Sequence, residues 1–256
     1  MIRRADSITD KLGGVQPPPY RVEGAGPLLV YIAGLDGTGE LFFKQAPLLA
    51  RRHRVVTFRS RDDGNFSYED LTDDIALIIR DLGARQATIL GESFGGTVAL
   101  SFALRYPRMV ERLVVINSFP RFRGRLRIKL GAWLAGSLPF WLLWPVRRGA
   151  NILGLLIDQV SREDRRRFWD AIRTVSAAAY ARRLQLIAGF DVEDRLPEIQ
   201  APALFIAGEY DLLVPSVREA FAMAARMPNA AVKVIKHAGH ACLIGGRVRL
   251  AELLTE

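Results

Sequence analysis

The sequence predicts an α/β protein whose mostly parallel, twisted sheet is flanked by helices and interrupted once by a helical insert. Short, continuous apolar runs bounded by glycine, proline or charged residues recur along the chain, as in strands that are covered on both faces. Helical patterns separate these runs, and such alternation is typical of parallel sheets. The alternation stops after Ser118 and resumes at Leu196.

Six apolar runs are predicted to be strands. They are Leu28–Ala33, Val55–Phe58, Ala87–Leu90, Leu113–Ile116, Ala203–Ala207 and Val232–Ile235. The last run contains Lys233, and a charged side chain within a strand favours a position near the sheet edge.

Three helices are predicted in the sheet-forming parts. Apolar residues from Leu71 to Leu82 recur at helical spacing, and Ser67 with Asp70 forms a capping signal before them. The small and apolar segment Thr97–Tyr106 is stopped by Pro107. A third helix is predicted at Val217–Met227, between two prolines.

These patterns divide the chain into two parts. Residues 1–118 and 196–256 are predicted to form the sheet-containing core, and residues 119–195 an inserted helical cap. A chain of 256 residues fits one such domain with an insertion. It is long enough to bury a large core without disulfides or metal.

The cysteine content, the N-terminus and the charge distribution limit the classes of protein to which the chain can belong. The single cysteine, Cys242, excludes an intrachain disulfide, and no Cys/His cluster has zinc-ligand spacing. The N-terminus has no apolar run of the secretory type, so we expect a cytoplasmic setting. Of the net charge of +9, residues 119–195 carry +8 without any nucleic-acid-binding motif, so no nucleic-acid partner is expected.

Ser93 is the predicted nucleophile. Gly91-Glu92-Ser93-Phe94-Gly95-Gly96 follows a predicted strand and precedes a predicted helix, the context that a G-x-S-x-G turn requires. The turn is so tight that side chains at Gly91 and Gly95 would collide with backbone. It would present the Ser93 hydroxyl at the carboxyl end of the sheet.

His240 and Asp211 are the predicted base and its orienting acid. A serine hydroxyl needs an adjacent base, and His240 follows the last predicted strand, where active sites of parallel sheets lie. Asp211 follows the preceding strand and fits the order Ser, acid, His. The rivals that stay open are His237 for the base and Glu209 for the acid.

Two main-chain N–H groups are expected to bind an oxyanion. The N–H of Phe94 lies at the start of the helix after the nucleophile. The second donor is expected in the loop after the first predicted strand, Gly34-Leu35-Asp36-Gly37-Thr38-Gly39, at Leu35. This loop lacks the glycine spacing of a dinucleotide site, and we expect neither a cofactor nor a metal.

Taken together, the motif around Ser93, the segment with Asp211 and the His237-Ala238-Gly239-His240 loop resemble the α/β-hydrolase superfamily, in its serine esterase and lipase-like branch. The resemblance implies the α/β-hydrolase fold, with a variable helical cap inserted after the sixth strand of the family order. The loop from Gly34 to Gly39 with Gly95-Gly96 is most similar to the esterase/acyltransferase-like group that includes phytyl ester synthases. That group acts on long-chain acyl substrates.

The predicted function is hydrolysis of a carboxylic ester of a small hydrophobic substrate through an acyl-enzyme. One alternative is an acyltransferase that passes the acyl group to an alcohol. Another is a weakly catalytic small-molecule-binding protein on the same fold. Cleavage of a thioester or a carbon–carbon bond by the same residues also stays open.

The insert carries all four tryptophans and a basic, then apolar, then basic segment. One hypothesis is a lid over an acyl pocket that also makes peripheral contact with an anionic membrane. The other is a cap whose aromatic residues pack inward while its arginines stay solvated. The basic residues concerned are Arg121, Arg123, Arg125, Arg127, Lys129, Arg147 and Arg148, and the tryptophans are Trp133, Trp141, Trp144 and Trp169.

Overall fold

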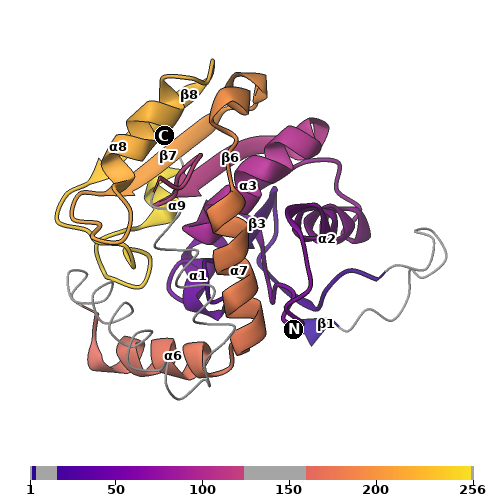
Figure 1. Ribbon diagram of the computed structural model, residues 1–256. Coiled ribbons are helices and arrows are strands. Elements are labelled where there is room, and N and C mark those ends of the chain that lie inside the picture. The colour runs from indigo at the N-terminus through magenta and orange to yellow at the C-terminus, as the bar shows by residue number, and fades with distance from the viewer. Residues whose placement is uncertain (1, 4–15, 124–159, 255–256) are drawn as a thin grey trace.

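The computed structural model describes residues 2–3, 16–123 and 160–254 (Figure 1). Its centre is an eight-stranded sheet in the order β1-β2-β4-β3-β5-β6-β7-β8. The strands are β1 (Ile2–Arg3), β2 (Tyr20–Glu23), β3 (Leu28–Ile32), β4 (Arg54–Phe58), β5 (Ala87–Glu92), β6 (Val110–Ile116), β7 (Ala203–Gly208) and β8 (Ala230–Ile235). β2 pairs antiparallel with β1 and β4, and the strands from β4 to β8 pair in parallel.

All six predicted strands are present, and β8 lies at the edge of the sheet as its lysine indicates. The strands β1 and β2 were not predicted. β2 is four residues long and alternates between buried and exposed positions, so it contains no continuous apolar run. It pairs with β4 all the same, through main-chain bonds that need no such run.

The helices are η1 (Glu40–Phe42), α1 (Ala46–Leu49), α2 (Tyr68–Asp81), α3 (Phe94–Arg105), η2 (Pro107–Met109), α6 (Arg162–Arg173), α7 (Ala177–Gly189), η3 (Glu193–Glu198), α8 (Ser216–Ala224) and α9 (Leu250–Leu253). The predicted capping box of α2 is present, with Ser67 and Asp70 each bonding the other's backbone N–H. α3 begins three residues before the predicted Thr97, because the chain enters the helix directly from Ser93. α8 ends at Ala224, short of the predicted Met227.

Alternate side chains of each strand pack on opposite faces of the sheet. On one face, Val30 of β3 joins a core with residues of α2 and α3. On the other, Leu29 and Tyr31 pack with residues of α1 and α9. Burial on both faces accounts for the continuous apolar runs from which the strands were predicted.

The described part of the insert contains two helices, α6 and α7, and an isolated β-bridge between Arg121 and Asp191. α6 and α7 meet at a sharp angle (Figure 1), and α6 packs against η1 through a small cluster that includes Leu41 and Phe168. The limits of the insert at residues 119 and 195 stay a prediction. Trp169 packs beside the Phe168 ring, whereas the other three tryptophans lie outside the described residues.

Contact of the insert with a membrane stays a prediction. Two of the seven basic residues named in that hypothesis are described, and both form ion pairs: Arg121 with Asp191 at 3.1 Å and Arg123 with Glu193 at 3.0 Å. The remaining five basic residues of that hypothesis lie outside the described residues. Within the described ranges, no helix combines the length and the apolar character that crossing a bilayer requires.

Candidate active site

Ser93 occupies a strained turn between β5 and α3. Its φ of 54° and ψ of −118° lie outside the regions that ordinary residues adopt. A methyl group at Gly91 would lie 2.2 Å from the Gly95 carbonyl oxygen, and one at Gly95 would lie 2.1 Å from the carbonyl oxygen of Ile32. The sequence therefore needs glycine on both sides of the serine to close this turn.

Neighbouring backbone holds the turn in place. The Ser93 N–H donates to the Ile116 carbonyl at 2.8 Å, and the Ser118 hydroxyl donates to the Ser93 carbonyl at 2.7 Å. Both partners come from the end of β6, the strand next to β5. The hydroxyl of Ser93 is thus fixed at the carboxyl edge of the sheet.

Two loops bring an imidazole and a carboxylate to this hydroxyl. His240, in the loop after β8, places Nε2 2.9 Å from Ser93 Oγ. Its Nδ1 lies 2.7 Å from Oδ2 of Asp211, which follows β7. The structure thus brings the three predicted residues together in one hydrogen-bonded line, although Ser93 and His240 are 147 positions apart.

Asp211 is held as a buried anion. Its side chain is 1% exposed, and its Oδ1 accepts the N–H groups of Leu213 and Val214 at 2.9 and 3.0 Å. The Ser216 hydroxyl donates to Oδ2. Burial alone would raise the pKa of Asp211, but the hydrogen bond and charge interaction with His240, with these other donors, lower it below its ordinary value.

An ionised Asp211 determines which nitrogen of His240 carries the proton. The carboxylate accepts a proton-bearing Nδ1, which leaves Nε2 as an acceptor for the Ser93 hydroxyl. This is the tautomer in which an imidazole can remove a proton from serine. The geometry therefore suits nucleophilic attack by Ser93.

The two rival residues form a separate pair. Glu209 accepts the backbone N–H of His237 at 2.8 Å, and the His237 ring packs edge-on against Tyr210. His237 has a φ of 57°, in the left-handed region, and its side chain is 61% exposed. The structure therefore places both rivals outside the hydrogen-bonded line of Ser93.

The segments that contain the two predicted oxyanion donors both lie next to the nucleophile, and the role of their N–H groups stays a prediction. Phe94 is the first residue of α3, where a backbone N–H has no acceptor within the helix. On the other side, a methyl group at Gly34 would lie 3.5 Å from Ser93 Cβ, so the loop after β3 passes close to the nucleophile. A turn bond from the Gly37 N–H to the Gly34 carbonyl, 3.0 Å long, shapes the loop around Leu35.

Asn117 is a residue of the site that the sequence analysis missed. It directly follows β6, is 1% exposed and has a φ of 48°. Its Nδ2 donates to the carbonyls of Gly239 and His240 at 3.1 and 2.9 Å, and its Oδ1 accepts the Gly208 N–H at 2.8 Å. One side chain therefore ties β6 to the end of β7 and to the histidine loop.

Position was the one signal that could have identified Asn117. A polar residue directly after a buried strand lies at the same edge of the sheet as the nucleophile.

The Asn117 amide also lies 3.3 Å from the sulfur of Cys242, which is fully buried. Among the residues with described positions, no group of three or more His, Cys, Asp or Glu side chains could hold a metal ion.

A family model described as the alpha/beta hydrolase fold matches residues 27–246. This range contains the turn of Ser93, both loops of the hydrogen-bonded line and the insert. The chain belongs to the alpha/beta hydrolase fold family.

Curated relatives in this family cover nearly the whole chain. A protein of Stutzerimonas stutzeri named "Putative carbamate hydrolase RutD" is 27% identical, over 92% of this chain and 93% of its own length. A protein of the same name from Caulobacter sp. is 29% identical over 83% of each chain. These matches support a hydrolase.

Solved structures agree with the fold. MenH from S. aureus has a TM-score of 0.80 at 20% identity, covering 92% of this chain and 96% of its own. An esterase from Exiguobacterium antarcticum also has a TM-score of 0.80, at 19% identity and 93% coverage of both chains. At these identities the likeness establishes the fold alone.

Proposed function

We propose that this chain is a serine hydrolase that cleaves a carboxylic ester of a hydrophobic substrate through an acyl-enzyme. The observation that carries the proposal is the line from Ser93 Oγ through His240 to the buried carboxylate of Asp211, with contacts of 2.9 and 2.7 Å. A hydroxyl becomes nucleophilic at neutral pH when a base accepts its proton, and a buried anion stabilises the charged base.

In the first half-reaction, Ser93 Oγ bonds to the carbonyl carbon while its proton passes to His240 Nε2. The carbonyl oxygen becomes an oxyanion, which the N–H groups of Leu35 and Phe94 bind. Each such donor contributes about 3–4 kcal/mol of transition-state stabilisation. The carbon–oxygen bond to the alcohol then breaks, and the alcohol leaves with the proton that His240 returns.

In the second half-reaction, water attacks the acyl group on Ser93. His240 takes a proton from the water as the new bond forms, and the oxyanion occupies the same two N–H groups. Collapse breaks the bond to Ser93 Oγ, which recovers its proton from His240. The products are the free acid and the starting enzyme, so no other reactant is needed.

Carbamate hydrolysis is a second candidate, because the curated relatives carry that name. A carbamate also presents a carbonyl carbon to Ser93, and its nitrogen or oxygen leaving group would take the proton from His240. When the oxygen group leaves, Ser93 carries a carbamoyl group, whose nitrogen donates electrons to the carbonyl carbon. We therefore expect water to release this group from Ser93 more slowly than it releases an acyl group.

The test combines active-site labelling with turnover. A fluorophosphonate probe should label the wild type at Ser93, and Ser93→Ala should abolish both labelling and p-nitrophenyl ester hydrolysis. Ser101→Ala is the matched control, because Ser101 lies on the same helix and its hydroxyl bonds only the Thr97 carbonyl among the described residues. It should retain both properties.

Parallel assays separate the candidates. Esters of increasing chain length should be compared with matched carbamates, with and without a long-chain alcohol. Formation of a new ester would favour an acyltransferase. Tight ligand binding without labelling or turnover would favour a small-molecule-binding protein and would reject the proposed hydrolase.

A further inference from the structure

Arg183 on α7 is a buried cation whose hydrogen-bond acceptors are main-chain carbonyls. It is 1% exposed and has the largest of the fully buried side chains in the described ranges. Burying a charge is strongly unfavourable unless specific partners compensate it. The carbonyls of Leu35, Asp36 and Arg61 accept from it at 3.1, 3.3 and 2.8 Å, while its Nε has no hydrogen-bond partner among the described residues.

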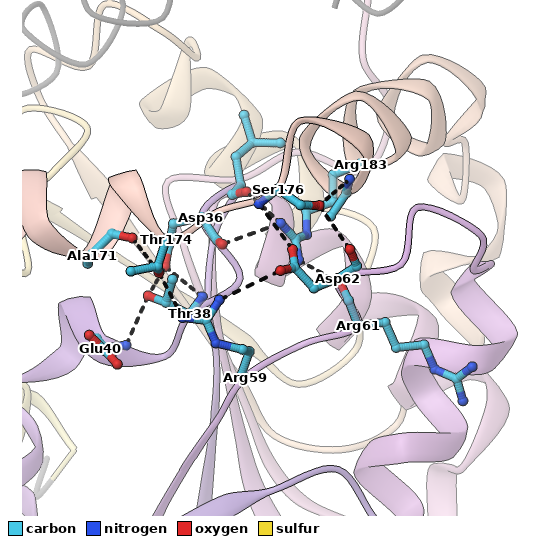
Figure 2. Close-up of polar contacts among 12 residues, drawn as sticks. Asp36, Thr38, Glu40, Arg59, Arg61, Asp62, Ala171, Thr174, Ser176 and Arg183 are labelled. Atoms are coloured by element: carbon cyan, nitrogen blue, oxygen red, sulfur yellow. Dashed lines mark hydrogen bonds and ion pairs between the residues drawn. The ribbon is translucent and has the colours of Figure 1, made fainter. Parts of the chain in front are cut away.

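Two of these three carbonyls belong to the oxyanion loop, which we define as residues 34–39. Figure 2 shows Arg183 reaching from its helix to Asp36 on one side and to the segment of Arg61 and Asp62 on the other. Gly37 has a φ of +63°, and a methyl group there would lie 2.2 Å from the guanidinium. The loop is therefore shaped to fit this one side chain.

One backbone bond also holds the loop from outside, because the Ser60 N–H donates to the Gly37 carbonyl at 2.8 Å. The Asp36 carboxylate is used within the loop, where it accepts the N–H and hydroxyl of Thr38 at 2.8 and 2.5 Å. Burial lowers the pKa of Arg183, while the nearby charges of Asp36 and Asp62 raise it. The cation thus lies against the backbone of the oxyanion loop.

A second set of contacts fixes the start of α7 against the core. The Ser176 hydroxyl, at the helix N-cap, donates to the Asp62 carbonyl at 2.9 Å, and its N–H donates to the Asp62 carboxylate at 3.3 Å. Arg59 donates to the Thr174 hydroxyl at 2.8 Å. Figure 2 shows these contacts beside Arg183, and none of them involves the oxyanion loop, so the start of α7 is docked independently of that loop.

We propose that Arg183 is a positioning residue, which holds the oxyanion loop from the insert and so aims the Leu35 N–H at the reacting carbonyl oxygen. The inference rests on the proposed acyl-enzyme function. Because one residue's carbonyl and N–H are linked through a single Cα, fixing the Leu35 carbonyl restricts where its N–H points. A displacement of about 1 Å at such a donor can lower a rate about 100-fold.

The experiment compares Arg183→Met and Arg183→Lys with Arg182→Met in the full-length protein. Arg182 is the neighbouring residue and donates to the Phe66 carbonyl at 2.6 Å, away from the oxyanion loop. The measurements are kcat and KM for a p-nitrophenyl ester and the inhibition constant of an alkyl boronic acid. The boronate adduct of Ser93 places an oxygen where the oxyanion forms.

Arg183→Met is expected to lower kcat about 10- to 100-fold and to change KM less than threefold. Boronate binding should weaken by the same factor as kcat/KM. Arg183→Lys keeps the charge but not the paired donors, so it should fold and recover part of the lost kcat. Arg182→Met should keep kcat within twofold of the wild type.

A folded Arg183→Met enzyme with kcat and boronate affinity like those of Arg182→Met would overturn the proposal. If Arg183→Met does not fold, Arg183→Lys decides, and a wild-type kcat in that variant would overturn the proposal equally. Failure of the proposed function is distinct, because a wild type that neither reacts with fluorophosphonate nor hydrolyses esters would show it before any variant is made.

Discussion

Asn117 donates from Nδ2 to the backbone carbonyl of His240, 2.9 Å away, and so holds the histidine by its main chain rather than by its ring. Its Oδ1 accepts the N–H of Gly208, the last residue of β7, so the same amide joins this loop to β7. The position of the imidazole, in the loop after β8, therefore depends on a side chain at the end of β6, two strands earlier in the chain.

Asn117→Ala should lower both stability and turnover. It removes the hydrogen bonds of the Asn117 amide to two carbonyls and to the Gly208 N–H, which costs about 1–3 kcal/mol of the free energy of unfolding. Because the histidine loop loses its anchor, kcat should fall by about tenfold or more. Denaturant unfolding and steady-state kinetics measure the two effects.

Asn229→Ala is the control for this variant. The Asn229 amide also donates to a carbonyl, that of Gln200 at 3.0 Å. It is exposed, however, and precedes β8 at the amino end of that strand, whereas the site lies at the carboxyl ends of the strands. It should leave kcat unchanged. Equal losses of kcat in the two asparagine variants would contradict a specific role for Asn117.

Asp211→Asn should lower kcat while the protein stays folded. Asparagine can present an N–H to Nδ1, which would favour the wrong tautomer and leave Nε2 unable to accept the Ser93 proton. The expected loss is about 10³- to 10⁴-fold in kcat. Glu209→Gln, at the carboxylate that bonds the His237 N–H, should have little effect, and a comparable loss there would reassign the acid.

The stability contributed by Asp211 should depend on pH in one direction. Its pKa is lowered in the folded protein from an ordinary value of 3.8. The unfolded chain therefore binds the proton more readily as pH falls, and the stabilisation is present above that value and lost below it. Acid titration of the free energy of unfolding should fall more steeply below about pH 4 for the wild type than for Asp211→Asn.

Asp194→Asn serves as the control in this titration, because the Asp194 side chain is 98% exposed. It should follow the wild-type curve closely. A wild-type stability that rises on going from pH 4 to pH 3 would be inconsistent with the lowered pKa of Asp211.

Alanine substitutions at two glycines should change the stability of the protein in opposite directions. At Gly95 the new methyl group would overlap the Ile32 and Ala33 carbonyl oxygens, at 2.1 and 2.6 Å, so unfolding or a loss of about 3 kcal/mol is expected. At Gly189, the last residue of α7, a methyl group meets no atom within 4 Å. Alanine there should stabilise the protein by up to about 1 kcal/mol. Thermal unfolding of both variants measures the contrast, and a stable Gly95→Ala protein would argue against the tight turn.

Much of the fold could be predicted from local patterns. A strand buried on both faces must be apolar throughout, so six strands are visible as continuous runs. The capping box at Ser67 and Asp70 involves residues within one stretch of four, so it too could be predicted from the sequence. β2 was missed because its stability comes from pairing with β4, not from an apolar run of its own.

The sequence by itself determined the tight turn of Ser93 and the positions of Asp211 and His240 after successive strands, because glycine requirements and strand order are local properties. Only the tertiary structure decided that Asn117 hydrogen-bonds the histidine loop and that Arg183 hydrogen-bonds the carbonyls of the oxyanion loop. Those contacts join residues 123 and 148 positions apart, and no local pattern records which distant carbonyl a buried donor will meet. They depend on how the chain packs, and packing is settled only when the whole sheet and its insert have come together.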